Sequence, residues 1–130
     1  MVRLRNTAVS PMKVFEISYD IEKYRNGSNS NGFFVALFAS SDGQYWTECG
    51  QPFFTRFVSD ADCNGLSEVP SVTKSVTGTF KQKVPCGGDI YLLWLYSVYE
   101  GSSSSSAQAL GIDNVVIRAC PEKATILLIR

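Results

Sequence analysis

Apolar and polar residues alternate along most of this chain, which is the period-two pattern of β-strands. The clearest run covers residues 14–24, where every second residue is apolar and those between are mostly charged or polar. Such a strand buries one face and exposes the other. Segments rich in Gly, Asn, Ser and Asp separate the runs, and no stretch keeps a 3.6-residue period. The pattern therefore predicts an all-β protein.

Two further runs, residues 33–39 and 90–99, are apolar on both faces, which is typical of strands in the centre of a sheet. Weaker runs at 45–49, 53–57, 71–80 and 110–118 complete the set, and the alternating Thr, Ser and Val of 71–80 indicate an edge or half-exposed strand. The serine-rich segment 101–107 is predicted to be a flexible surface loop. Roughly eight strands with turns at this spacing predict a two-sheet antiparallel β-sandwich of the jelly-roll type.

Composition excludes several classes of function. The chain has 12 basic and 12 acidic side chains and no histidine. Zero net charge argues against binding to nucleic acid and against polybasic attachment to a membrane. Without histidine there is no Ser-His-Asp or Cys-His hydrolase and no zinc site built on imidazole. No run approaches transmembrane length and no signal peptide is visible, so membrane insertion is not expected.

Four cysteines, Cys49, Cys63, Cys86 and Cys120, leave two interpretations open. None of them form a C-x-x-C pair, so neither a thioredoxin motif nor a zinc ribbon is expected. An exported chain would form up to two disulfides, in any of three pairings, whereas a reducing compartment would keep four free thiols.

The polar face of residues 14–24 raises the question of catalysis. Ser18, Asp20 and Glu22 stand at the positions of the Glu-x-Asp-x-Glu signature of the laminarinase-type glycoside hydrolases. Sugar hydrolysis of this kind needs two carboxylates on one strand face. The first position is serine here, so the residue used as nucleophile is missing. We therefore predict no catalytic residue, and a solvated strand face is the simpler interpretation.

Three aspartates are candidate metal ligands. Asp60 and Asp62, with Asn64, have the spacing of the first half of an EF-hand loop, but Ser71 replaces the glutamate of the twelfth position. Asp113 lies inside a strand-like apolar run, where a carboxylate must be hydrogen-bonded, metal-bound or at a strand edge. The alternatives are ordinary turns for the first two and capping of backbone amides for Asp113.

Aromatic side chains next to polar turns are candidates for stacking on sugar rings. Tyr24, Tyr45 and Trp46 have this position and are the predicted ligand-binding residues. Trp94, within a run that is apolar on both faces, is predicted to pack in the core.

Several motifs in a fixed order suggest a family. Residues 2–6 and 22–27 match segments that typically read LRLRN and EQWRNG, and residues 41–46 match a DG…W hairpin. Residues 62–65 match an LDGN-like loop, and residues 110–115 match a closing LAIDDV strand. Together they resemble the concanavalin A-like, lectin- or glucanase-type, jelly-roll modules of bacterial secreted or surface proteins. The last strand is also similar to that of MAM adhesion domains.

The resemblance implies an extracellular, non-catalytic binding or adhesion module. Its expected partners are a glycan or a cell-surface protein, with a structural calcium ion at Asp113. A structural spacer or assembly domain without a small ligand is the alternative, and a glycoside hydrolase is the third hypothesis.

The two ends of the chain depart from that pattern. Such modules usually have another strand before LRLRN, so the domain at 1–120 is expected to lack an N-terminal strand and to be a fragment or a domain separated from its export signal. Residues 121–130, with an apolar stretch at 126–129, form a tail or an extra edge strand. We expect this tail, or a sheet edge, to mediate self-association.

Overall fold

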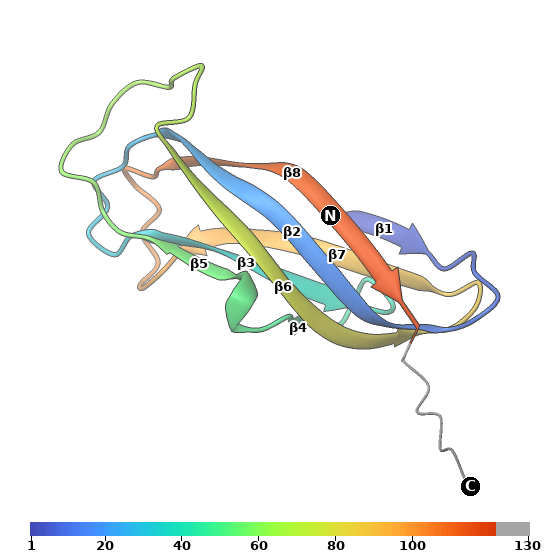
Figure 1. The fold of residues 1–130 in the computed structure, drawn as a ribbon. Helices are drawn as coiled ribbons and strands as arrows, with labels where there is room; N and C mark the ends of the chain where they lie inside the picture. The colour runs from blue at the N-terminus through green and yellow to red at the C-terminus, as the bar shows by residue number, and fades with distance from the viewer. Residues whose placement is uncertain (122–130) are drawn as a thin grey trace, which may run out of the picture.

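The computed structural model describes residues 1–121, which fold into two antiparallel β-sheets packed face to face (Figure 1). The elements are β1 (Val2–Arg5), β2 (Met12–Arg25), β3 (Phe33–Ser40), β4 (Thr47–Glu48), the 3-10 helix η1 (Gln51–Phe53), β5 (Phe54–Phe57), β6 (Val72–Val84), β7 (Asp89–Val98) and β8 (Ala109–Cys120). The predicted antiparallel β-sandwich is confirmed. The predicted tail or extra strand lies outside the described residues from position 122 onwards.

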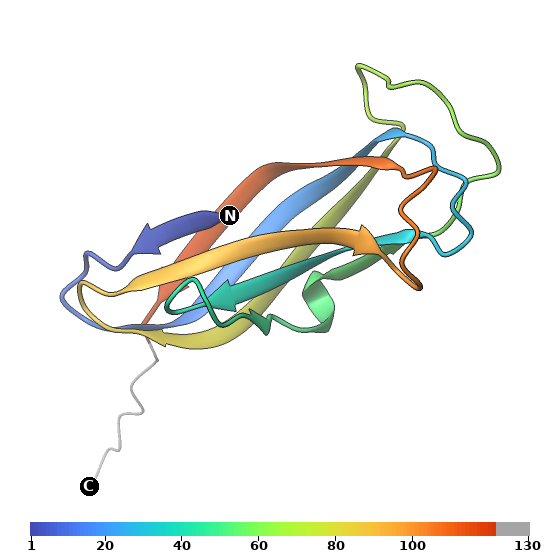
Figure 2. The same cartoon turned by 180° about the vertical axis from the view of Figure 1, so that it is seen from behind.

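One sheet has five strands in the order β1-β7-β3-β4, with β5 also paired to β3, and the other has three in the order β6-β2-β8 (Figure 2). The two-sided apolar runs form β3 and β7, which are central strands as predicted. The alternating Thr, Ser and Val run forms β6, an edge strand as predicted. Strand β4 is shorter than the pattern indicates, because only Thr47 and Glu48 pair with β3.

Strand β1 has only four residues, so no alternation of apolar and polar residues can be recognised there in the sequence. It pairs with β7 from Val2 to Arg5, and two arginines strengthen the contact. Arg3 and Arg5 donate hydrogen bonds to the carboxylate of Asp89, at 2.6 and 3.0 Å. These bonds and the two positive charges lower the pKa of Asp89 to about 2. The ion pairs are exposed, so they fix the position of β1 more than they stabilise the fold.

The core lies between the sheets and is built from alternate residues of the long strands. Its fully buried side chains include Phe15, Ile17, Tyr19 and Ile21 from β2, Val35, Leu37 and Ala39 from β3, and Ile90 and Leu92 from β7. Phe53 of η1 is completely buried, with its ring 6.5 Å from that of Tyr19 and 6.2 Å from that of Phe80. Trp94 is half-buried, as predicted for a core residue, with its ring edge-on to Tyr19 at 5.7 Å.

The serine-rich loop is anchored to the neighbouring turn, although its composition predicts a flexible segment. The side-chain amide of Asn29 donates to the carbonyl oxygens of Ser103 and Ser105, at 2.8 and 2.9 Å. Gly27 allows the two segments to touch, because a Cβ at this position would lie 2.4 Å from the carbonyl oxygen of Ser106. The loop therefore has a fixed path at one end of the sandwich.

Candidate functional site

The three-stranded sheet packs against the five-stranded sheet with one side and turns the other away from it (Figure 1), and the residues on that outer side are mostly polar. Because successive side chains of a strand point to opposite sides, the residues of β2 between its buried apolar side chains lie on this outer side. Their partners on β6 and β8 share the same side. We call this surface the polar face; it consists of Glu16, Ser18, Asp20, Glu22, Tyr24, Thr73, Ser75, Thr77, Gly111, Asp113, Asn114, Val116 and Arg118.

Tyr24, one of the predicted ligand-binding residues, lies at the end of β2 with its ring over the neighbouring strand β8. A Cβ built on Gly111 would be 3.1 Å from Cε2 of this ring, so the tyrosine rests against a glycine backbone. Its hydroxyl donates a hydrogen bond to the carboxylate of Glu22. That bond, partial desolvation and the charges of Glu22 and Asp113 raise the pKa of Tyr24. The ring is therefore held in place beside two carboxylates.

Strand β8 has a β-bulge where it passes Asp20. Asp113 is paired with Asp20, and Val116 with Ser18. Two residues of β8, Asn114 and Val115, therefore lie between these pairs, opposite a single residue of β2. Asn114 has a φ of 52°, in the left-handed region that asparagine tolerates better than most residues. The backbone N–H of Asn114 donates to Oδ1 of Asp113 at 2.7 Å. Capping of a backbone amide, one of the two alternatives for Asp113, is thus present in the structure.

The bulge also directs the Asn114 side chain towards Asp20. Its amide nitrogen lies 2.8 Å from Oδ2 of Asp20, and the Ser75 hydroxyl donates to Oδ1 at 2.6 Å. The bonds from Ser75 and Asn114 lower the pKa of Asp20, so it is ionised at neutral pH. A carboxylate has about four acceptor sites, so Asp20 and Asp113 retain capacity for hydroxyl groups of a ligand.

A shallow hollow of about 200 Å³ lies farther along the same surface. It is lined by Glu16, Ser18, Thr77, Val116 and Arg118 together with the backbone side of Ile17. An acid, a base, two hydroxyls and one aliphatic side chain surround it, a mixture that suits a polyhydroxylated ligand more than a purely apolar one.

The predicted calcium ligands are separated by the sheet, because Asp60 lies on the inward side of β2. Its Oδ1 accepts a hydrogen bond from the ammonium group of Lys23 at 2.5 Å. Its Oδ2 accepts from Gln108 at 2.8 Å and from the backbone N–H of Gly27 at 3.0 Å. Burial raises the pKa of Asp60, but the bonds from Lys23, Gln108 and Gly27 and the charge of Lys23 together bring it below its ordinary value.

This arrangement does not fit a calcium loop. The Lys23 ammonium already supplies the positive charge at Asp60, and Oδ1 of Asn64 accepts the backbone N–H of Asn26 at 2.7 Å. Calcium needs six to eight oxygen ligands. Over residues 1–121, no group of three or more Asp, Glu, Cys or His side chains is placed to hold a metal ion. Calcium binding by these aspartates stays a prediction.

Tyr45 and Trp46 lie between the end of β3 and the start of β4, whereas Tyr24 lies at the end of β2, next to the turn that leads into the start of β3. They belong to the turn that follows Ser40, the last residue of β3. Ser40 pairs with Tyr91, near the start of β7. Asp42 stabilises the turn, accepting the backbone N–H groups of Gln44 and Tyr45 at 2.8 and 2.9 Å. The predicted ligand-binding residues thus do not form one site, and only Tyr24 lies on the polar face.

A second exposed surface, which we call the aromatic face, covers the outward side of the five-stranded sheet (Figure 2). Its members are Phe34, Phe38, Phe54, Tyr91, Leu93, Leu95 and Tyr99. The rings of Phe34 and Phe54 stack at 5.0 Å, and the Arg56 guanidinium lies 3.6 Å from the centre of the Tyr99 ring. The strands that are apolar on both faces indicate such a surface in the sequence. In a two-layer fold a strand meets the core on one side only, so its second apolar side lies outward.

All four cysteines are free thiols, and two of them have opposite environments. Hydrogen bonds from the Ser28 hydroxyl and backbone lower the pKa of the exposed Cys63, whereas burial raises the pKa of the half-buried Cys49 to about 12. The thiolate is the nucleophile, so at pH 8 iodoacetamide is expected to modify Cys63 first and Cys49 last. A mass-spectrometric time course measures this order, and equal rates at the two positions would contradict it.

No protein family, curated protein or solved structure matches this chain. Among the described residues there is no helix with the length and apolar character needed to cross a membrane.

Proposed function

We propose that this chain is a non-catalytic carbohydrate-binding module of an extracellular or cell-surface protein, and that it binds a glycan on the polar face. The observation that carries the proposal is the Tyr24 ring, fixed over Gly111 next to the carboxylates of Glu22 and Asp113. Sugar rings combine C–H surfaces, which pack on aromatic rings, with hydroxyls, which need acceptors and donors. The resemblance to concanavalin A-like modules supports the same ligand class.

The strand that carries the acids supports binding without turnover. Ser18, Asp20 and Glu22 share the outward side of β2, the arrangement that the glycosidase signature requires. Ser18 provides no carboxylate at the nucleophile position. Asp20 is kept ionised by two hydrogen bonds, and Glu22 is occupied by the Tyr24 hydroxyl. These acids therefore act in the proposal as acceptors for sugar hydroxyls.

The test is a glycan array probed with the purified chain, followed by calorimetry with the glycan class that binds. Tyr24→Ala is expected to weaken binding about fivefold, because it removes an aromatic contact worth about 1 kcal/mol. Tyr45→Ala is the matched control and should bind as the wild type does, since Tyr45 lies away from the polar face and is 81% exposed.

Removal of calcium with EDTA is expected to leave the affinity unchanged, because the Asp60 carboxylate is already paired with the Lys23 ammonium and the polar face is proposed to bind sugar directly. Near-ultraviolet circular dichroism confirms that each variant is folded. The proposed function would be contradicted if the folded wild type bound no glycan on the array, or if the two tyrosine variants lost the same amount of affinity.

The aromatic face favours a second candidate function, that of an assembly domain. Its stacked and half-exposed rings offer a surface for another protein instead of a glycan. In that case the chain would be silent on the array and would form a complex that Phe34→Ser weakens and Tyr24→Ala does not. Sedimentation velocity of the two variants separates this function from the first.

A further inference from the structure

Charge is unevenly distributed along the three-stranded sheet. Next to Tyr24, the charged members of the polar face are carboxylates, those of Asp20, Glu22 and Asp113; we call this part the acidic end. At the other end of the same strands the charged side chains are mostly positive. This cationic end consists of Lys13 from β2, Lys81 and Lys83 from β6, and Arg118 from β8, and Glu16 is its one acid within residues 1–121.

The cationic end is hollowed. A hollow of about 480 Å³ is lined by Lys13, Val14, Glu16, Lys81, Gln82, Lys83, Cys120 and Pro121. Glu16 also lines the hollow of about 200 Å³ that contains Ser18, Thr77 and Arg118. Because they share this residue, the two hollows adjoin along β2. A ligand on the polar face can therefore extend from the acidic end into the cationic end.

Three cations of this end have no carboxylate partner. Lys81, Lys83 and Arg118 are exposed, and none of them forms an ion pair within residues 1–121. By contrast, the Arg3 guanidinium on the other sheet lies 2.6 Å from the carboxylate of Asp89. Ammonium and guanidinium groups donate charge-assisted hydrogen bonds to carboxylates and other oxyanions. An acidic group can thus bind at the cationic end without displacing an existing ion pair.

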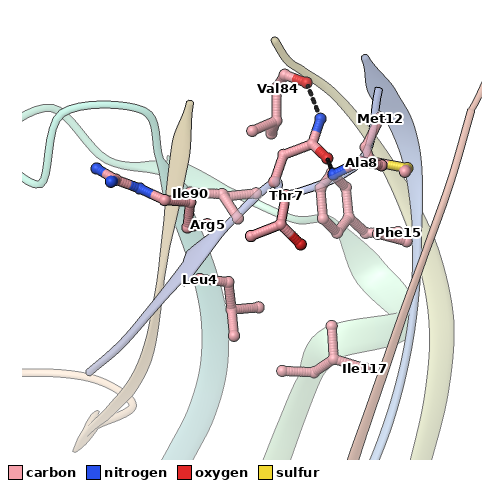
Figure 3. A pocket seen from close by; sticks show the side chains of 11 residues that line it. Leu4, Arg5, Thr7, Ala8, Met12, Phe15, Val84, Ile90 and Ile117 are labelled. Atoms are coloured by element: carbon pink, nitrogen blue, oxygen red, sulfur yellow. Dashed lines mark hydrogen bonds between the residues drawn. The ribbon is translucent and has the colours of Figure 1, made fainter. Parts of the chain in front are cut away.

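The apolar pocket between the two sheets offers no such groups (Figure 3). It has a volume of about 300 Å³, and its lining includes Leu4, Met12, Phe15, Ile90 and Ile117. The side-chain amide of Asn6 in this lining donates to the carbonyl oxygen of Val84 at 3.1 Å and accepts the backbone N–H of Ala8 at 3.0 Å. The guanidinium of Arg5, the one charged residue of the lining, is bound to Asp89. An acidic ligand therefore has its partners on the polar face and not in this pocket.

We propose that the glycan bound on the polar face is acidic at one end only, and that its terminal carboxylate or sulfate group binds at Lys81, Lys83 and Arg118. This inference rests on the proposed function and names the class of glycan. The neutral part of the ligand then lies along the two hollows towards Tyr24. Further acidic groups there would meet the carboxylates of the acidic end, and like charges repel.

The length of the polar face sets the size of the ligand. Glu16 and Tyr24 lie eight residues apart on β2, which is about 26 Å at about 3.3 Å per residue. A single sugar ring is too short to contact both ends. The ligand class is therefore an oligosaccharide that ends in an acidic sugar.

The array tests this class by comparing each neutral oligosaccharide with forms that end in sialic acid, in a uronic acid or in a sulfated sugar. Polysialic acid serves as a uniformly acidic chain. The acid-terminated forms are expected to bind about tenfold more tightly than their neutral parents, because each exposed charge contact contributes a few-fold. This preference should shrink at high ionic strength, since salt screens exposed charges. Polysialic acid should bind more weakly than the acid-terminated forms.

Two variants assign the preference to the cationic end. Calorimetry with the double variant Lys81→Gln, Lys83→Gln should find most of the preference lost and the affinity for the neutral parent unchanged. Arg3→Gln is the control, because it removes an exposed cation from the other sheet, and it should keep the wild-type preference. Near-ultraviolet circular dichroism shows that both variants are folded.

The outcomes separate this inference from the proposed function. If neutral and acid-terminated forms bind equally and Tyr24→Ala still weakens binding, the acidic class is wrong and the proposed function stands. If polysialic acid binds as tightly as the acid-terminated forms, or if the lysine variant keeps the preference, the assignment to one end is overturned. If the folded wild type binds no glycan, the proposed function fails and this inference fails with it.

Discussion

Replacement of Asp60 with alanine is expected to lower the free energy of unfolding by about 3 kcal/mol. The Lys23 side chain is 9% exposed, and its ammonium would lose the carboxylate that compensates its charge. Gln108 and the backbone of Gly27 would each lose an acceptor as well. Urea denaturation measures the change, and Asp62→Ala, at the exposed neighbouring acid, should have almost none.

Two further measurements separate the ion pair from other causes. The double variant Lys23→Met, Asp60→Ala should recover part of the loss, because an apolar side chain has no charge to compensate. The pKa of Asp60 is lowered in the folded state, so its contribution is present above the ordinary carboxyl pKa and is lost as the pH falls through the folded value. The difference between wild type and Asp60→Ala should therefore shrink below about pH 4. A constant difference down to pH 2 would contradict the assignment.

Phe53→Ala is expected to cost about 4 kcal/mol, because it removes a completely buried ring and leaves a cavity. This ring fills the space between η1, Tyr19 and Phe80. The next residue provides the control: Phe54 lies on the aromatic face, half-exposed, and stacks on Phe34 at 5.0 Å. Phe54→Ala should cost about 1 kcal/mol. Similar losses in the two variants, measured by thermal and urea unfolding, would contradict the assignment of Phe53 to the core and of Phe54 to the aromatic face.

Alternation predicts the strands of this protein better than it predicts their partners. The run at 14–24 becomes β2 with its apolar side inward, because a one-residue slip would expose the whole apolar set. Strand β1 has four residues, too few for a period to be recognised, and its position depends on Asp89, which is more than eighty residues away. Distant pairings of this kind leave no local pattern.

The candidate site is less predictable because three distant segments form it. The sequence identifies Tyr24 and the acids of β2, but it does not show that Gly111 lies beneath the tyrosine ring. Nor does it reveal the bulge at Asn114, which sets the register between Asp113 and Asp20. At Asp60 the aspartate-rich spacing suggests a calcium loop, and it does not reveal that the Lys23 ammonium pairs with this carboxylate.

The pairing order of the strands has a consequence for how the protein is made on the ribosome. β1 pairs with β7, and β2 pairs with β6 and β8. The first two strands therefore cannot form their sheet pairings until the second half of the chain has been synthesised. Until then, only β3, β4 and β5 have neighbours close in sequence. Such non-local topologies fold slowly and expose apolar strands while incomplete. Newly synthesised β2, with its four large buried side chains, is therefore the segment for which a chaperone would matter most.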